Sequence, residues 1–254
     1  MAPTTHPYGD HPHQFGELSL PDGTAAGGAP VPVAVLVHGG FWLAEFGLER
    51  MRALAHDLAA RGWAAWNVEY RRLGAGSDGG WPQTAQDVSA AVDHLRTLAA
   101  DVPLDLGRVV TIGHSAGAHL VLLDAAERPG DAPVGLSAVV GQAPLTDVEH
   151  AYSLGQGIDI IEAFMGGGPT ERAAEYAAAS PVTRVPLGVR QLVVQGEQDE
   201  MVPPAMVASY VAAAREAGDD VTFDLRPDDG HFELIEPDSG GWAAVLAWLE
   251  AQGV

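Results

Sequence analysis

The sequence contains no cysteine and no lysine, and all 13 of its basic residues are arginine. Without lysine, the chain cannot form a Schiff base, anchor a pyridoxal cofactor, supply a P-loop lysine or use a Ser-Lys dyad. Without cysteine, it has no thiolate nucleophile, disulfide, iron–sulfur cluster or cysteine-bound zinc. A side-chain nucleophile in this protein is therefore expected to be an oxygen.

Positive charge is also scarce, because 34 acidic residues against 13 arginines give a net charge of −21 over 254 residues. Phosphate backbones and anionic lipids repel such a chain, and no basic patch interrupts the acidity, so we expect neither a nucleic-acid nor a membrane partner. The N-terminus has no basic segment followed by an apolar one, and no eighteen apolar residues run together. These features predict a cytoplasmic protein and leave its oligomeric state open.

Apolar segments of strand length alternate with segments of helical spacing along most of the chain. The predicted strands are residues 14–20, 33–37, 64–70, 108–112, 136–141, 191–195 and 221–226. The predicted helices are residues 48–61, 82–100, 118–127, 204–217 and 241–251. Strands that alternate with helices pair in parallel, so the pattern predicts an α/β fold with a mostly parallel, doubly wound sheet and helices on both faces.

We expect one α/β domain over residues 1–254, since a single core can reach this size. Residues 148–179 show an irregular helical pattern, which predicts a small cap or lid inserted into that domain. The N-terminal segment, which carries His6, His11 and His13, is expected to be a mobile, solvated loop.

A serine motif stands at residues 113–117, which read Gly-His-Ser-Ala-Gly between a predicted strand and a predicted helix. In this context the pattern is typical of a nucleophile elbow, where the serine occupies a strained turn and the glycines let strand and helix approach closely. Ser115 is therefore the candidate nucleophile. The alternative is a serine in an ordinary glycine-rich turn.

A serine hydroxyl needs a base, which is normally a histidine oriented by a carboxylate. Asp199 and His231 each follow a predicted strand, and the ends of parallel strands are where such sheets bind their ligands. The chain order Ser115, Asp199, His231 is the order typical of α/β-hydrolases. Asp147 is a second candidate for the acid, although its position suits a helix cap equally well.

Acyl transfer also needs N–H donors for the oxyanion. Ala116, directly after the serine, offers one, and the glycine-rich loop at 38–42, which reads His-Gly-Gly-Phe-Trp, offers others. The alternative for this loop is a simple tight turn.

The loop at 38–42, the elbow at 113–120 and the Gly-His-Phe segment at 230–232 together resemble the serine α/β-hydrolases. Within them the chain is similar to the kynurenine formamidase-like and small esterase branch, whose loop reads His-Gly-Gly-x-Trp. The resemblance covers most of the chain and implies the α/β-hydrolase fold, with the amides of Gly40 and Phe41 joining Ala116 in the oxyanion hole. Phe41 also replaces the third glycine of hormone-sensitive-lipase-type esterases, which argues against that branch.

These observations predict a serine hydrolase that cleaves small-molecule carboxylic esters or aryl formamides through an acyl-enzyme on Ser115. Alternatives are a kynurenine formamidase acting on N-formylkynurenine, an acyl transferase, and a non-catalytic binding protein with the hydrolase fold. No metal or organic cofactor is expected, because the side chains supply the covalent chemistry. The predicted substrate pocket consists of Trp42, His114, Tyr152 and Phe164, while His38 and His119 are expected to hold loops.

Overall fold

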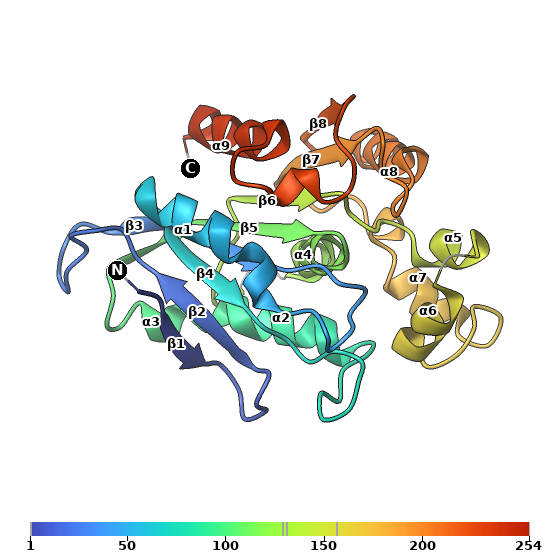
Figure 1. The fold of residues 1–254 in the computed structure, drawn as a ribbon, viewed down its shortest axis with the longest axis horizontal. Helices are drawn as coiled ribbons and strands as arrows, with labels where there is room; N and C mark the ends of the chain where they lie inside the picture. The colour runs from blue at the N-terminus through green and yellow to red at the C-terminus, as the bar shows by residue number, and fades with distance from the viewer. Residues whose placement is uncertain (1, 129, 131, 156, 254) are drawn as a thin grey trace.

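The computed structural model describes residues 2–253 except 129, 131 and 156. One eight-stranded sheet, in the order β1-β2-β4-β3-β5-β6-β7-β8, runs through the molecule (Figure 1). The strands are β1 (Thr4–Pro7), β2 (Phe15–Ser19), β3 (Val31–Val37), β4 (Ala64–Val68), β5 (Leu104–His114), β6 (Ala138–Gln142), β7 (Arg190–Gly196) and β8 (Val221–Arg226). Strands β4, β3, β5, β6, β7 and β8 pair in parallel, whereas β1 and β2 form an antiparallel edge.

Helices cover both faces of this sheet, and strand β3 shows why. Its Val33, Val35 and Val37 enter one hydrophobic cluster, while the intervening Ala34 and Leu36 enter the other. A strand buried on both faces is an apolar run without alternation, as β3 is in the sequence. The first cluster is completed by α2 (Gln83–Asp93), α3 (Leu95–Leu98), α4 (Ala116–Glu127) and α8 (Pro204–Glu216), and the second by α1 (Arg52–Ala60) and α9 (Gly240–Gln252).

The segment expected to form a cap contains three short helices, α5 (Val148–Ser153), α6 (Ile158–Met165) and α7 (Ala173–Ala178). These three helices lie together at one end of the sheet, on the same side of the molecule as α8 (Figure 1). Short 3₁₀ turns complete the chain at η1 (Leu48–Met51), η2 (Pro181–Thr183) and η3 (Glu233–Ile235).

The N-terminal segment differs from its expected mobile loop. Residues Thr4–Pro7 pair with β2 in an antiparallel ladder, and His6 lies opposite Gly16. His13 bonds the hydroxyl of Ser77 at 2.8 Å. The prediction was wrong because this edge strand is short, polar and largely exposed, so no apolar alternation marks it.

Candidate active site

Parallel pairing brings the three proposed catalytic side chains to one edge of the sheet. Ser115 follows β5, Asp199 follows β7, and His231 follows β8. Strands β5, β6, β7 and β8 are consecutive neighbours and run in the same direction, so their carboxyl ends lie together. All three side chains are buried, with at most 7% of each residue exposed.

Ser115 occupies a strained backbone conformation between β5 and α4. Its φ of 55° and ψ of −121° lie in a region that costs a non-glycine residue about 1–3 kcal/mol. The crossing of β5, α4 and β3 is too close for a side chain at the neighbouring glycine, because a Cβ on Gly117 would clash with the carbonyl oxygens of Val37 and His38. The glycine pattern therefore reflects a real packing requirement of this turn.

Asp199 and His231 form a buried hydrogen-bonded pair. The Nδ1 atom of His231 lies 2.7 Å from Oδ2 of Asp199, and the carboxylate oxygen Oδ1 accepts N–H bonds of 2.8 Å from Met201 and Val202. Burial opposes ionisation of Asp199, but His231 and the two backbone donors outweigh it and lower the pKa of the carboxyl. An ionised Asp199 fixes the tautomer of His231 and leaves its Nε2, which has no partner among the described residues, for other chemistry.

Ser115 and His231 line the same small cavity, together with Gly40, Phe41 and Met201. The ring of His231 also packs against that of His114, with 4.7 Å between the ring centroids, and Nε2 of His114 donates to the backbone oxygen of His231 at 2.9 Å. Burial and the nearby His231 lower the pKa of His114 to about 3. His114 is therefore a neutral support that holds the backbone of His231.

The glycine-rich loop after β3 has an unusual backbone beside Ser115. Gly40, Phe41 and Trp42 have φ values of 124°, 52° and 57°. A Cβ on Gly39 would lie 2.8 Å from the carbonyl oxygen of His114 and 3.0 Å from Cβ of Ser115, so only glycine fits against the elbow. Within the described part of the chain, the N–H groups of Gly40, Phe41 and Ala116 donate to no acceptor.

A buried polar network holds this loop. His38 bonds the oxygen of Gly39 at 2.7 Å through Nδ1 and the carboxylate of Glu69 at 2.9 Å through Nε2. The hydroxyl of Tyr70 donates to the oxygen of His38 at 2.7 Å, and Arg72 lies 3.2 Å from Glu69. Burial raises the pKa of Glu69, but His38, Arg72 and the backbone N–H of Tyr70 lower it by more, so the net shift is downward and keeps the carboxylate ionised.

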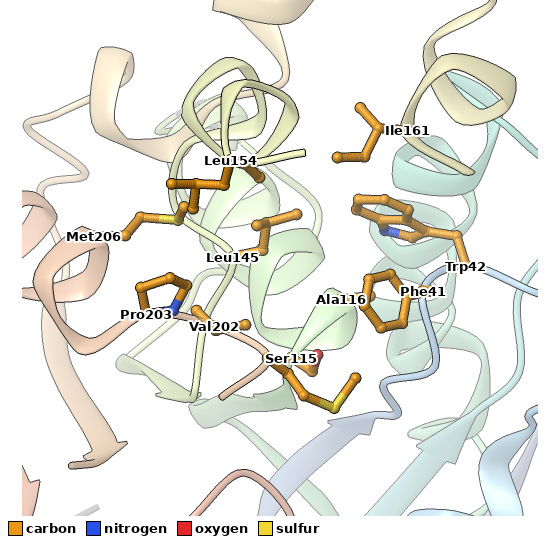
Figure 2. A pocket seen from close by; sticks show the side chains of 12 residues that line it. Phe41, Trp42, Ser115, Ala116, Leu145, Leu154, Ile161, Val202, Pro203 and Met206 are labelled. Carbon is orange, nitrogen blue, oxygen red and sulfur yellow. The ribbon is translucent and has the colours of Figure 1, made fainter. Parts of the chain in front are cut away.

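Ser115 also lines a second cavity, whose walls are apolar. Figure 2 shows Ser115 at one end and Leu154 and Ile161 at the other. The side walls are Phe41 and Trp42 on one side and Val202, Pro203 and Met206 on the other. Apart from Ser115, the residues that line this cavity are apolar.

Of the four predicted pocket residues, two line a cavity beside Ser115 and two do not. Trp42 lines the apolar cavity, and His114 lines the cavity shared by Ser115 and His231. Phe164 lines neither, because it stacks behind Trp42 with 4.0 Å between ring centroids. Tyr152 also lines neither, since its hydroxyl donates to Glu162 at 2.7 Å. The last two positions are therefore corrections to the sequence analysis.

Sequence reasoning missed most of the apolar wall. Met201, Val202 and Pro203 lie two to four residues after Asp199 in the loop that follows β7, and this closeness to a candidate site residue was a usable signal. The residues from α5, α6 and α8 carried no such signal. An apolar residue on a helix normally packs in the core, and only the tertiary placement of these helices turns it toward a cavity.

Two other residues considered in the sequence analysis, Asp147 and His119, hold the backbone through hydrogen bonds. Asp147 caps α5 by accepting the N–H of His150 at 2.9 Å, and Nε2 of His119 donates to the oxygen of Ala179 at 2.7 Å. The described residues include no group of three histidine and acidic side chains placed to hold a metal ion. Among the same residues, no helix is long and apolar enough to cross a membrane.

Comparison with known proteins places this arrangement in a family. The BD-FAE sequence profile matches residues 20–212, which is more than half of the chain. The chain belongs to the BD-FAE family. The matched residues include the loop at 38–42, Ser115 and Asp199, and they end before β8 and His231.

Two esterases of Mycobacterium tuberculosis are related to this BD-FAE member. Esterase LipQ is 30% identical over 206 residues, which are 76% of this chain and 48% of LipQ. Esterase LipC is 28% identical over 248 residues, which are 90% of this chain and 59% of LipC. The chain thus spans only about half to three-fifths of the length of these relatives.

Solved structures share the fold at low sequence identity. A truncated carbohydrate esterase from gut microbiota has a TM-score of 0.83 at 19% identity, covering 99% of this chain and 96% of that one. Esterase B of Lactobacillus rhamnosis has a TM-score of 0.82 at 19% identity, covering 99% and 84%. The BD-FAE member therefore has the α/β-hydrolase fold expected from its sequence.

Proposed function

We propose that this protein is a serine carboxylesterase. The observation that carries the proposal is the shared cavity of Ser115 and His231, with Ser115 on a strained elbow and His231 bonded at 2.7 Å to a buried, ionised Asp199. A hydroxyl, an imidazole and a carboxylate in these surroundings suit nucleophilic acyl transfer. The esterase relatives support the same reaction class.

The proposed reaction has two acyl-transfer steps. His231 takes the proton of Ser115 while Oγ attacks the ester carbonyl carbon, and the N–H groups of Gly40, Phe41 and Ala116 stabilise the oxyanion. His231 then gives its proton to the leaving oxygen as the bond to the acyl group breaks. Water repeats the sequence on the acyl-enzyme and releases the acid, while Asp199 stays ionised and stabilises the imidazolium.

The apolar cavity suits a short aliphatic acyl group. It is lined by Ser115 and the proposed donor Ala116, and Leu154 and Ile161 line its far end. Butyrate and similar chains would bury their methylene groups there at about 0.8 kcal/mol per CH₂. We therefore propose butyrate-sized esters as better substrates than long-chain esters.

An aryl formamide is the second candidate substrate, because the His-Gly-Gly-Phe-Trp loop resembles that of the kynurenine formamidase-like branch. A formyl group is smaller than butyryl and has no methylene group to bury against the apolar walls. The apolar lining therefore favours the ester, and comparison of the two substrates decides between them. Acyl transfer to an alcohol is distinguished by analysing the products with methanol present.

The deciding experiment compares wild type, Ser115→Ala and Ser209→Ala, where Ser209 is an exposed serine on α8. We expect wild type and Ser209→Ala to hydrolyse p-nitrophenyl butyrate and to bind a fluorophosphonate label. Ser115→Ala should lose the label and about 10⁴- to 10⁶-fold in turnover. Equal hydrolysis by Ser115→Ala would refute the proposal, as would activity that a chelator abolishes and a divalent ion restores.

A further inference from the structure

Arg50 lines the cavity that holds Ser115 and His231, and among the described residues it has no anionic partner. Its guanidinium carbon lies 4.4 Å from the ring centroid of Phe46 and 5.8 Å from that of Phe232. Its side chain forms no salt bridge or hydrogen bond with any residue that the structure describes. In a chain with 34 acidic residues, an arginine left unpaired beside reactive groups needs a specific explanation.

The acidic side chains adjacent in sequence to Arg50 and to Phe232 are already engaged elsewhere. Glu49 accepts the N–H of Gly47 at 3.0 Å, and Glu233, from the segment after His231, accepts the N–H of Gly230 at 3.1 Å. The two aromatic rings hold Arg50 through cation–π contacts, which leave the N–H donors at the guanidinium edge available. These donors match a carboxylate, which a guanidinium binds in a bidentate manner.

The two cavities divide the proposed substrate at Ser115. His231 must give a proton to the leaving oxygen, so the leaving group lies on the side of the cavity that His231 lines. The apolar cavity contains Ser115 and Ala116 without His231, and it takes the acyl group. Arg50 therefore faces the alcohol part of the ester.

We propose that Arg50 selects esters whose alcohol or phenol part carries a carboxylate. This inference rests on the proposed esterase function and narrows its substrate class to short acyl esters of hydroxy acids. The net charge of −21 slows the approach of any anion, and Arg50 supplies the local attraction that offsets this repulsion. Phe46 and Phe232 also present their rings to an aromatic leaving group.

The test uses four butyrate esters that differ only in the phenol. These are 3- and 4-carboxyphenyl butyrate and their neutral 3- and 4-carbamoylphenyl counterparts. The readout is the ratio of kcat/KM for a carboxylate ester to that for its neutral counterpart, measured at low ionic strength. For at least one position on the ring, we expect Arg50→Gln to lower this ratio about tenfold, since hydrogen bonds to charged groups are stronger than neutral ones.

Two further variants serve as controls. Arg96→Gln removes the same charge from an exposed site on α3, and we expect it to keep the wild-type ratio. Arg50→Lys keeps the charge without the planar fork, so its ratio should lie between wild type and Arg50→Gln. In wild type, added salt should lower the ratio.

An unchanged ratio in Arg50→Gln for both ring positions would overturn this inference, as would an equal loss on charged and neutral esters. Hydrolysis of the neutral esters in those cases would leave the proposed esterase function intact. Failure of wild type to hydrolyse any of the four esters or p-nitrophenyl butyrate would overturn the proposed function and this inference together.

Discussion

Residues with positive φ gather around the proposed nucleophile. Of the five described non-glycine residues in this region of backbone space, Phe41, Trp42 and Ser115 belong to the candidate site. Each such conformation costs about 1–3 kcal/mol and persists only where the surrounding contacts impose it. The close approach at Gly117 and the polar network of Glu69 supply these contacts, so the strain depends on the tight packing around the elbow.

A methyl group at Gly117 tests this packing. Gly117→Ala would press a Cβ against backbone oxygens of β3 and the following loop, which cannot rotate away, so we expect a loss of at least about 1–3 kcal/mol in the free energy of unfolding. Gly135→Ala is the control, because a Cβ there meets no atom within 4 Å, and it should be neutral or stabilise by up to about 1 kcal/mol. Urea denaturation measures both, and equal stabilities would contradict the packing argument.

The two candidate acids are separable by a pair of substitutions. Asp199→Asn removes the charge opposite His231, and we expect it to lower kcat for p-nitrophenyl butyrate by about 10⁴-fold. Asp147→Ala removes only the cap of α5, so it should cost about 1 kcal/mol of stability and keep most of the activity. A large loss of kcat in Asp147→Ala with full activity in Asp199→Asn would reverse the assignment.

At the scale of elements, the buried strands and long helices are predictable because their burial leaves a mark on the sequence. Strand β3 is a run of valine, alanine and leucine, and α4 follows the elbow without interruption. Elements whose neighbours decide their shape are less predictable. The expected helix at 48–61 begins as the 3₁₀ turn η1, and the expected helix at 82–100 divides at His94 into α2 and α3. Neither change has a glycine or proline signal.

The candidate site likewise contains residues that the sequence predicts and residues that it does not. Ser115 and the loop at 38–42 sit on local motifs whose glycines are required by close backbone contacts, so these positions could be picked from the sequence alone. The wall made by Leu154, Ile161 and Met206 depends on how three separate helices come together, which no local pattern encodes. The specificity of the pocket therefore belongs to the helices of the 148–179 segment and to α8.

Helix α6 offers a direct test of the pocket wall. Ile161→Ala shortens a buried side chain at the far end of the apolar cavity, so we expect the kcat/KM ratio of p-nitrophenyl hexanoate to butyrate to rise severalfold. Ile160→Ala makes the same change on the same helix without lining the cavity, and its ratio should match wild type. Stability should fall by about 2–5 kcal/mol in Ile161→Ala. A common shift in both variants would place the effect in general loosening of the helix.

At the scale of the whole molecule, two of the arginines neutralise carboxylates that the fold buries. Arg71 pairs with Asp87 and Arg128 pairs with Asp124, and in both pairs the acidic side chain is almost fully buried. Breaking such a pair leaves an uncompensated charge and costs about 3–5 kcal/mol. Most of the excess negative charge therefore faces solvent, where acidification toward the pI of about 4.5 reduces its mutual repulsion.

Two buried histidines, His114 and His119, have the opposite effect and destabilise the folded protein as the pH falls. Burial lowers the pKa of His114 to about 3 and that of His119 to about 4, whereas an unfolded histidine binds its proton near pH 6.5. Between about pH 6.5 and 4 the unfolded chain thus binds more protons than the native one. The contribution of these two histidines to the free energy of unfolding is fully present above pH 6.5. It falls as the pH decreases through this window, by up to about 1.4 kcal/mol per pH unit for each histidine.

His119→Gln isolates one of these contributions, because a glutamine amide can still donate to the oxygen of Ala179 without titrating. We expect the variant to lose about 2 kcal/mol less than wild type between pH 6.5 and 5.0, since the unfolded state no longer gains that proton. Urea unfolding followed by tryptophan fluorescence, at fixed ionic strength from pH 7.5 to 5.0, measures the difference. Parallel stability curves for the two proteins would show that His119 takes up its proton in the folded state, and they would contradict the burial argument.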